Sequence, residues 1–349
     1  MRPFLTRALL LSGLLASTSC TQAPRVPTAS PEAAPSGIDL AGMDRSIAPG
    51  DDFFAWANGS WLRSAEIPAD RSSWGSSGEM AERTAKRVAD LIREAAASNA
   101  PAGSEARKVG DTFATFLDEA TIEARGLEPL RPELDRIDAV ADATGLARAL
   151  GGTLRADVDA FNATDLYTPN VLGLWVAQDL DEPARYAPFL LQGGLGMPDR
   201  DYYLDPSPRM ARIRESYLRH AAKVLDLAGV ADAGAVAERV VALETRIARN
   251  HATREESSDV AKGNNRWTRD DFPKRAPGLD WSAFFDAAGL GGQQAFVVWQ
   301  PEAVTGLAAL VREVPLSTWK EYLSFRCLES AATYLPKAFA DEEFAFYGR

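Results

Sequence analysis

The sequence predicts a mostly α-helical protein that carries one small β-sheet. Beyond residue 37, apolar residues recur at intervals of three and four along most of the chain, which places them on one face of a helix. Three short segments break this spacing and are rich in β-branched and aromatic residues, as strands are. The chain has 349 residues, of which 46% are hydrophobic and 25% charged, so it is long and apolar enough to bury a large core. This composition excludes an intrinsically disordered chain.

Amphipathic helices account for most of the predicted structure. In the first of them, Val88, Leu91, Ile92 and Ala95 share one helical face. We therefore expect a multi-helix lobe within residues 38–349. The other expected helices, each with the same kind of apolar stripe, cover residues 109–117, 208–228, 232–250, 301–313 and 317–347.

The three predicted strands are residues 171–177, 186–191 and 296–299. The first two flank the polar segment 178–183, whose acidic residues and proline are typical of a hairpin connection. We therefore expect a small sheet or hairpin inside the helical lobe.

The N-terminus has the features of a secretory signal. A basic start is followed by the apolar run 8–16 and by small residues up to Cys20. This run is too short to span a hydrocarbon core of about 30 Å. Small residues before a lone cysteine resemble the lipobox of bacterial lipoproteins, with a plain signal peptide as the alternative. We predict a lipoprotein-type signal peptide over 1–19, a lipid anchor on Cys20 and a Pro/Ala-rich tether over 20–37. Thr21 resembles the residue found in lipoproteins of the outer membrane, so the expected location is its periplasmic face.

The charge balance excludes a protein that binds a phosphate backbone. The chain has 38 Lys and Arg against 49 Asp and Glu, a formal net charge of −11, so no nucleic acid partner is expected. With so many carboxylates, no Asp/Glu pair can be singled out as a general acid and base. Cys327 lies in an apolar helical pattern and is expected to be a small buried hydrophobe, not a nucleophile.

The two histidines of the chain are too few for a catalytic zinc site. Such sites use three protein ligands, and their helical signature H-E-x-x-H sets two imidazoles one turn apart. His220 and His251 are far apart in the sequence. We expect His220 at the surface or edge of a helix. We expect His251 to end a helix, where a cationic ring interacts favourably with the helix dipole.

Ser317 and Lys320 match S-x-x-K, the acylating pair of penicillin-binding enzymes. The accompanying S-D-N and K-T-G elements are missing, and Thr318 with Glu321 has the spacing of a capping box at a helix start. We therefore expect a structural role here, with a serine hydrolase as a minor alternative. The Gly-rich segment 193–198 is expected to form a turn and not a phosphate-binding loop, because a proline ends it.

The most distinctive stretch is the aromatic segment 49–62. Asp51 or Asp52 is expected to cap a short helix, and Asn58-Gly59 is expected to stop it with a positive φ. Three rings of this segment are expected to dock inward: Phe53, Trp56 and Trp61.

Two further segments, 194–204 and 319–323, are equally distinctive in composition. Shorter segments in consistent order support them: 253–257, 264–268, 297–301 and 344–348. Together with the aromatic segment they resemble the N-terminal domain of the neprilysin and endothelin-converting-enzyme family of zinc metallopeptidases. The residues that carry the resemblance, which we expect to be structural, are Asp52, Phe53, Phe54, Asn58, Gly59, Trp61, Pro68, Gly196, Pro198, Asp199, Arg200, Asp201, Tyr202 and Tyr203.

The resemblance implies that residues 38–349 form a helical lobe of the substrate chamber in a zinc metalloendopeptidase that acts on short peptides. Family members continue into a catalytic half with an N-A-F-Y segment, the H-E-x-x-H helix and an E-x-x-x-D zinc ligand, and this sequence ends before the expected place of all three. We therefore expect no catalytic and no metal-binding residue in this chain. Zinc, the catalytic half and short peptides belong to the intact enzyme. The alternative is a stand-alone lipoprotein that binds peptides or a partner protein.

Overall fold

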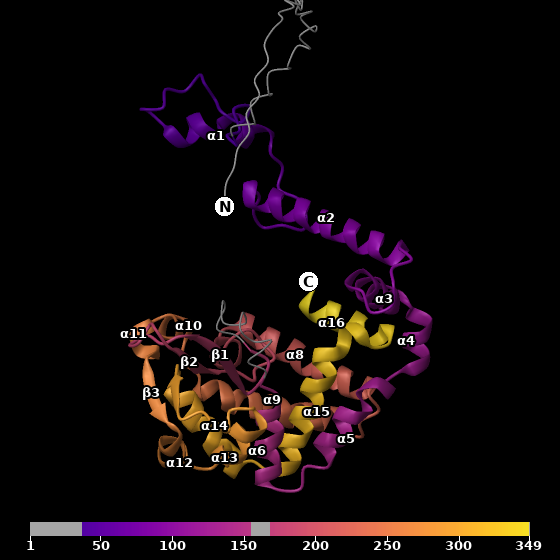
Figure 1. The fold of residues 1–349 in the computed structure, drawn as a ribbon, viewed down its shortest axis with the longest axis vertical. Helices are drawn as coiled ribbons and strands as arrows, with labels where there is room; N and C mark the ends of the chain where they lie inside the picture. Colours follow the sequence, from indigo (N-terminus) through magenta and orange to yellow (C-terminus); the bar gives the residue numbers. More distant parts are fainter. Residues whose placement is uncertain (1–36, 155–167, 349) are drawn as a thin grey trace, which may run out of the picture. The chain divides into compact units, whose positions relative to one another are not determined.

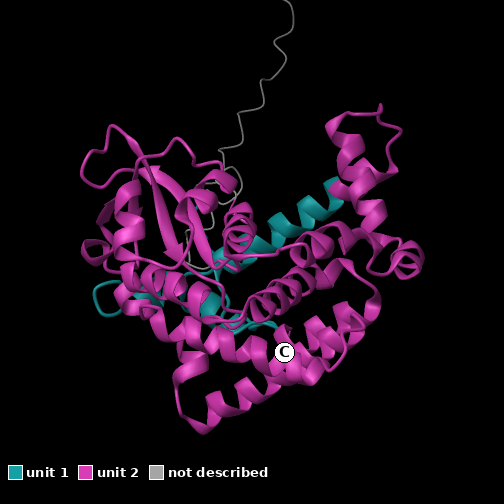
Figure 2. Ribbon diagram, turned by 90° about the horizontal axis from the view of Figure 1, so that it is seen from below, with its two compact units in different colours: residues 1–91 teal, residues 92–349 magenta. Residues whose placement is uncertain are grey.

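The computed structural model describes residues 37–154 and 168–348. The predicted signal peptide, the Cys20 anchor and all of the tether except Gly37 lie outside the described residues. The chain divides into two compact units, residues 1–91 (unit 1) and 92–349 (unit 2), and each is described by itself (Figure 2). In the part of the chain that the structure describes, no helix is both long and apolar enough to cross a membrane.

Unit 1 contains helix α1 (Phe53–Ser64) and most of helix α2 (Ser76–Ala97). Asp52 caps α1 as predicted, because its carboxylate accepts a hydrogen bond from the Ala55 amide at 2.8 Å. The predicted stop at Asn58-Gly59 is wrong, since α1 continues through both residues.

Two contacts explain why α1 continues. The Asn58 side chain donates a hydrogen bond to the Phe54 carbonyl at 3.1 Å, inside the helix. Gly59 is buried against Asp44, and a Cβ on Gly59 would lie 2.8 Å from the Asp44 Cβ. The glycine therefore permits a close approach and does not supply a positive φ.

The aromatic rings of α1 are only partly covered. Trp56 and Trp61 are half-buried, but Phe53 is 66% exposed, so the prediction that Phe53 docks inward is wrong. The Phe53 ring lies 5.3 Å from the Trp56 ring, and Phe54 is also exposed. A helical pattern identifies the apolar residues of α1, but it does not tell which of them a neighbouring element covers.

The predicted small sheet is confirmed and lies in unit 2 (Figure 1). Strands β1 (Leu172–Gln178) and β2 (Tyr186–Gln192) form the predicted antiparallel hairpin. Strand β4 (Ala295–Val298) pairs parallel with β2, and Phe189 lies opposite Val297. A fourth strand, which the sequence did not predict, is β3 (Asn265–Thr268), antiparallel to β4. The strand order is β1-β2-β4-β3.

Helices form the rest of unit 2. Its short 3₁₀ turns are η1 (Glu128–Leu130), η3 (Arg269–Asp271) and η4 (Ala332–Tyr334). Its α-helices are α3 (Glu105–Leu117), α4 (Glu119–Arg125), α5 (Arg131–Asp138), α6 (Ala143–Gly152), α7 (Asp201–Leu204), α8 (Pro208–Leu227), α9 (Ala233–Asn250), α10 (Arg254–Ser257), α11 (Val260–Gly263), α12 (Phe272–Arg275), α13 (Trp281–Ala287), α14 (Pro301–Glu313), α15 (Leu316–Ala331) and α16 (Lys337–Tyr347).

The structure corrects two details of the last predicted helix. The stripe over 317–347 is divided into α15, η4 and α16, and α16 begins after Pro336. The predicted capping box of Thr318 and Glu321 is wrong, because α15 starts after Pro315 and has no side-chain cap. Glu321 instead accepts from Arg239 of α9 at 2.7 Å.

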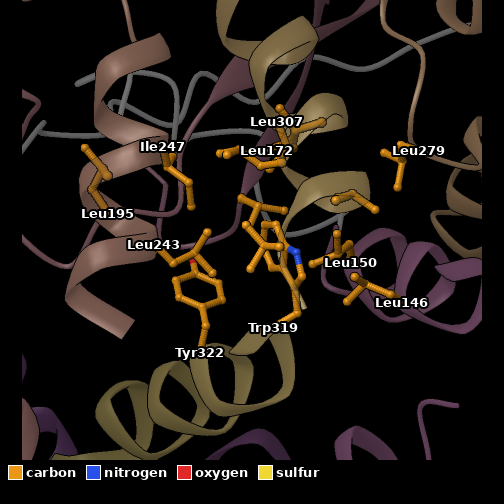
Figure 3. Close-up of a cluster of buried hydrophobic side chains, with 14 of the residues drawn as sticks. Leu146, Leu150, Leu172, Leu195, Leu243, Ile247, Leu279, Leu307, Trp319 and Tyr322 are labelled. Atoms are coloured by element: carbon orange, nitrogen blue, oxygen red, sulfur yellow. The ribbon is translucent and has the colours of Figure 1, made fainter. Parts of the chain in front are cut away.

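The main core lies where α9 packs against α8, α14 and α15 and where one face of the sheet is covered. Figure 3 shows Trp319 and Tyr322 rising from α15 toward Leu243 and Ile247. The opposite face of the sheet carries a second apolar cluster. Its buried members are Ala187, Phe189, Leu191, Val297 and Trp299.

Candidate ligand cleft and its buried polar support

A cleft with a volume of about 670 Å³ opens in unit 2 where three segments meet. It is lined by residues of the loop 192–200, by residues of the segment 251–258 after α9, and by Tyr347 of α16. Each of these overlaps a segment that carries the family resemblance. The fold thus brings together, around one concave site, three stretches that the sequence singled out separately.

Backbone contacts to tyrosines hold the loop that forms the floor of the cleft. The Tyr203 hydroxyl oxygen accepts hydrogen bonds from the amides of Gly196 at 3.1 Å and Met197 at 3.0 Å. Gly196 has no room for a side chain, because a Cβ there would lie 1.8 Å from the Tyr217 hydroxyl oxygen. The predicted turn is therefore a tightly held loop.

The side chain of Gln192 clamps the second wall of the cleft to the end of β2. Its Oε1 accepts from the Ala252 amide at 2.8 Å, and its Nε2 donates to the Ala252 carbonyl at 3.1 Å. The Gln192 amide itself donates to Oε1 of the buried Gln300 at 2.9 Å. The segment after α9 is thus fixed to the sheet by its own backbone.

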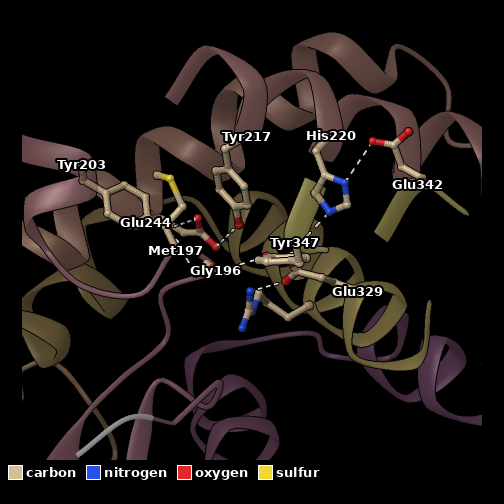
Figure 4. A network of polar contacts seen from close by, with 10 residues as sticks. Gly196, Met197, Tyr203, Tyr217, His220, Glu244, Glu329, Glu342 and Tyr347 are labelled. Carbon is tan, nitrogen blue, oxygen red and sulfur yellow. Dashed lines mark hydrogen bonds and ion pairs between the residues drawn. The ribbon is translucent and has the colours of Figure 1, made fainter. Parts of the chain in front are cut away.

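Beneath the loop, the carboxyl of Glu244 is fully buried between two tyrosines (Figure 4). Tyr203 donates to its Oε2 at 2.8 Å and Tyr217 donates to its Oε1 at 3.2 Å. Burial raises the pKa of Glu244 to about 7, assisted by the negative charge of Glu329, whereas the Arg326 charge and the tyrosine hydrogen bonds lower it. Glu244 therefore exchanges its proton near neutral pH.

Arg326, Glu329 and Tyr347 extend this network to the cleft. Arg326 and Glu329 of α15 form a short ion pair in which both side chains are largely buried. The Tyr347 hydroxyl lies 3.0 Å from the Gly196 carbonyl oxygen and also within hydrogen-bond distance of Glu329. Its single hydrogen serves one of these acceptors at a time. The loop is thereby connected to α15 and α16 as well as to α9.

His220 is buried, so the prediction of a surface or edge position is wrong. Its Nδ1 lies 3.1 Å from Oε1 of Glu342, and its ring stacks on Phe346 with centroids 4.8 Å apart. Both partners belong to α16, which packs across α8 and covers the ring.

His251 ends α9 as predicted, but its ring is not the expected cation. The side chain is buried, and Nε2 donates to the Gly193 carbonyl at 3.1 Å. Burial lowers the pKa of His251 to about 4, and the nearby charge of Arg200 lowers it further. The imidazole is therefore neutral at neutral pH.

Charged side chains of both signs line the cleft. Arg254 is 81% exposed and lies 4.0 Å from the Asp199 carboxylate. Glu256, beside the cleft, is engaged by its own helix, since its Oε2 accepts from the Thr253 amide at 3.0 Å. Arg200 is half-buried, and its Nε has no hydrogen-bond partner.

Of the remaining signature residues of unit 2, Pro198 is among the residues that line the cleft, and Asp201 and Tyr202 are not. Pro198 lines the cleft and is exposed, and Asp201 is exposed at the start of α7. Tyr202 is half-buried, and its carbonyl accepts from Arg214 at 3.1 Å. The signature residues of unit 1 are Asp52, Phe53, Phe54, Asn58, Gly59, Trp61 and Pro68.

The sequence motifs that suggested other chemistry have structural contacts. Lys320 donates its ammonium to the Asp138 carbonyl at 2.5 Å, and Ser317 is exposed on the first turn of α15. Cys327 is half-buried and not fully buried as predicted, and burial raises the pKa of its thiol to about 11. This thiol is not a thiolate nucleophile at neutral pH.

The residues present do not fit a zinc ion. Within residues 37–154 and 168–348, no three His, Cys, Asp or Glu side chains are grouped so that they could hold a metal. Both histidines lie in these ranges and are engaged in the contacts given above. No step of a zinc mechanism is therefore assigned to this chain.

The sequence analysis did not identify the charged residues Glu244, which is buried, and Arg326, which is largely buried. Glu244 stands on the apolar face of α9, one turn after Val240 and one turn before Ile247, where a charged residue is out of place. Arg326 stands likewise one turn after the buried Tyr322 of α15. The sequence feature that could have indicated their burial is a charged residue at a position of the helix where apolar residues recur.

Comparisons with known proteins identify the family to which this chain is similar. The family model described as Peptidase family M13, for the N-terminal part of these enzymes, matches residues 49–349. Mouse endothelin-converting enzyme-like 1 is 26% identical over an alignment of 312 residues, and the alignment covers 86% of this chain and 39% of that protein. The endothelin-converting enzyme homolog of the locust Locusta migratoria is 27% identical over an alignment of 317 residues, and the alignment covers 86% of this chain and 43% of that protein.

A solved structure is also similar. The zinc metalloprotease Zmp1 of Mycobacterium tuberculosis, in complex with an inhibitor, aligns with a TM-score of 0.75 and 34% identity over 90% of this chain and 47% of that one. The chain thus spans less than half the length of these relatives. The chain belongs to peptidase family M13 and corresponds to the N-terminal domain of these zinc metallopeptidases.

Proposed function

We propose that this chain forms the helical, non-catalytic part of an M13 zinc metallopeptidase that acts on short peptides, and that the zinc-binding residues lie outside this sequence. The observation that carries the proposal is the engagement of both histidines. His220 is held by Glu342 and Phe346, and His251 is bonded to Gly193. An H-E-x-x-H site needs two available imidazoles on one helix face, which these residues do not provide.

Exposed apolar side chains on α2 support the proposal that another polypeptide packs against this helix. This helix has 22 residues and buries none of them. Met80 is 60% exposed, Val88 48% and Leu91 63%, and the three share one side of the helix. Because exposed apolar side chains that share one side of a helix are typical of interaction sites, we propose the catalytic half of the peptidase as this partner. A stand-alone binding module, the alternative that the sequence raised, would leave this face in water.

The proposal is tested by assaying the zinc-supplemented chain for cleavage of a quenched fluorescent peptide of about eight residues, with and without a chelator. Mycobacterium tuberculosis Zmp1 is the positive control. We expect no chelator-sensitive cleavage by the chain, and cleavage that the chelator stops by Zmp1. Chelator-sensitive cleavage by the chain alone would overturn the proposal.

The serine-hydrolase alternative has its own test. The Lys320 ammonium is bonded to a backbone carbonyl, so it is not available to activate Ser317. We expect no labelling by a fluorophosphonate probe. Labelling that is lost in Ser317→Ala would support the hydrolase and contradict this assignment.

We also propose that the chain is exported and anchored through a lipid on Cys20, on the periplasmic face of the outer membrane. The support is the order of basic start, apolar run and small residues before this cysteine. The anchor leaves the folded residues free to meet short peptides in that compartment.

A further inference from the structure

Arg200 lines the cleft and has no ion-pair partner among the residues that the structure describes. Its Nε is buried and has no hydrogen-bond partner, and the side chain as a whole is half-buried. Burying a charged group is costly unless a partner of opposite charge compensates it. A half-buried arginine whose Nε lacks a hydrogen-bond partner is therefore a candidate ligand-binding group in the wall of the cleft.

The nearest carboxylates are committed to other groups. Glu256 accepts from the Thr253 amide at 3.0 Å and from the Thr253 hydroxyl at 3.2 Å, and its other oxygen lies 3.9 Å from the Lys262 ammonium. Asp199 accepts from the Asp201 amide at 2.9 Å and faces Arg254 at 4.0 Å. Neither carboxylate forms an ion pair with Arg200. Hydrogen bonds from Thr253 lower the pKa of Glu256, and the more distant charge of Arg200 adds to this lowering.

The other residues that line the cleft indicate which ligand charge Arg200 would favour. Arg254 at the rim is already matched by Asp199, and His251 is a neutral donor to the Gly193 carbonyl. The lining of the cleft thus includes one arginine, Arg200, that has no ion-pair partner among the described residues. A singly charged anion satisfies it, whereas a dianion would meet the carboxylates of Asp199 and Glu256.

We propose that Arg200 binds a carboxylate of a short peptide in this cleft. A planar guanidinium matches the two oxygens of a carboxylate. The volume of about 670 Å³ suits a small ligand, and the partly exposed Tyr347 ring and Pro198 offer apolar contacts to peptide side chains. The choice of a peptide as the source rests on the proposed function.

The floor of the cleft is built to stay in place without a ligand. The loop that carries Arg200 is bonded through Gly196 and Met197 to Tyr203, and through Tyr203 to Glu244. A site held in this way loses little flexibility when a ligand binds.

Calorimetric titration of the full chain with three peptides tests the proposal. The probes are Ala-Ala-Phe with a free carboxylate, Ala-Ala-Phe amide, and Ala-Glu-Phe amide, whose only carboxylate is in a side chain. We expect the first to bind about 10- to 100-fold more tightly than the second, as a charge-assisted pair implies. Equal binding of all three peptides overturns the proposal, because two of them carry a carboxylate and the third carries none. Tight binding of Ala-Glu-Phe amide supports it and assigns the carboxylate to a side chain. Tighter binding of inorganic phosphate than of any peptide overturns it.

Two matched variants separate a binding role of Arg200 from a structural one. We expect Arg200→Gln to lose the preference for the free carboxylate, and Arg254→Gln, at the rim, to change affinity less than about threefold. Because Arg200 lacks a counterion in the described structure, we expect the thermal midpoint of Arg200→Gln to equal or exceed that of the wild type. A lowered midpoint would assign Arg200 to the fold and overturn the proposal. These measurements need neither zinc nor cleavage, so chelator-sensitive activity of the chain alone would refute the proposed function without touching this result.

Discussion

Glu244 and His251 titrate in opposite senses, so we expect their effects on stability to cancel in the wild-type chain. Burial raises the pKa of Glu244 from 4.5 to about 7, so the folded state holds this proton more tightly than the unfolded state does. The resulting stability is complete below pH 4.5 and is lost as the pH rises through about 7. Burial lowers the pKa of His251 from 6.5 to about 4, so its contribution is complete above pH 6.5 and is lost as the pH falls through about 4.

The magnitude follows from these values. One pK unit corresponds to about 1.4 kcal/mol, so each group changes the free energy of unfolding by about 3 kcal/mol across its window. Between pH 4.5 and 6.5 the two slopes oppose each other and have the same size. Asp44 and Asp179, whose pKa values are lowered to about 2 by hydrogen bonds, act below this window.

The variant Glu244→Gln removes one of the two slopes. Its amide can still bond the hydroxyls of Tyr203 and Tyr217, and the neighbouring charges of Arg326 and Glu329 are unchanged. We expect its free energy of unfolding to fall by about 2 to 3 kcal/mol on acidification from pH 6.5 to 4.5, whereas the wild type changes by less than about 1 kcal/mol.

Urea unfolding followed by tryptophan fluorescence at steps of half a pH unit measures these slopes. The matched variant His251→Gln keeps a hydrogen-bond donor for the Gly193 carbonyl. Of the two opposing pH dependences, only that of Glu244 remains in this variant. Its stability is expected to fall by a similar amount as the pH rises from 4.5 to 6.5. If both variants keep the slope of the wild type, the reasoning is refuted.

Three further predictions concern the loop, the exposed helix and the anchor. Gly196→Ala is expected to lower the free energy of unfolding by about 2 to 4 kcal/mol, because its Cβ would lie 1.8 Å from a hydroxyl oxygen. The control Gly234→Ala, with open space around it, should change the stability in urea by less than about 1 kcal/mol. Equal effects of the two substitutions would contradict the close contact at Gly196. Leu91→Gln is expected to change urea stability by less than about 0.5 kcal/mol, and a loss above about 2 kcal/mol would show that this face is a core. Cys20→Ser is expected to abolish incorporation of a palmitate analogue in cells while Cys327→Ser does not, and labelling that survives Cys20→Ser would contradict the anchor.

Local patterns were sufficient for the helices and for most of the sheet. The stripe over 301–313 coincides with α14, and the hairpin of β1 and β2 follows the two predicted strands and their polar connection. Strand β3 was missed because its four residues include Asn265 and Arg266, whose side chains do not form an apolar pattern. Its pairing with β4 comes from the fold and not from its own sequence.

The candidate site could not be assembled from the sequence, because distant segments create it. His220 is buried by α16, more than a hundred residues later in the chain, so its own helix gave no sign of burial. The signature 194–204 drew attention to Arg200 but not to its missing counterion, which depends on where Glu256 and Asp199 find other partners. Burial and pairing are properties of the whole fold.

Zinc binding by the purified chain tests the central claim most directly. The measurement is a competition titration against a chromophoric zinc chelator at neutral pH, with the double variant His220→Gln/His251→Gln as the control. We predict that the wild type and the double variant compete equally weakly, because both imidazoles are buried and each is held by another group, Glu342 for His220 and the Gly193 carbonyl for His251. One zinc ion held per chain against the chelator, and lost in the double variant, would contradict the account.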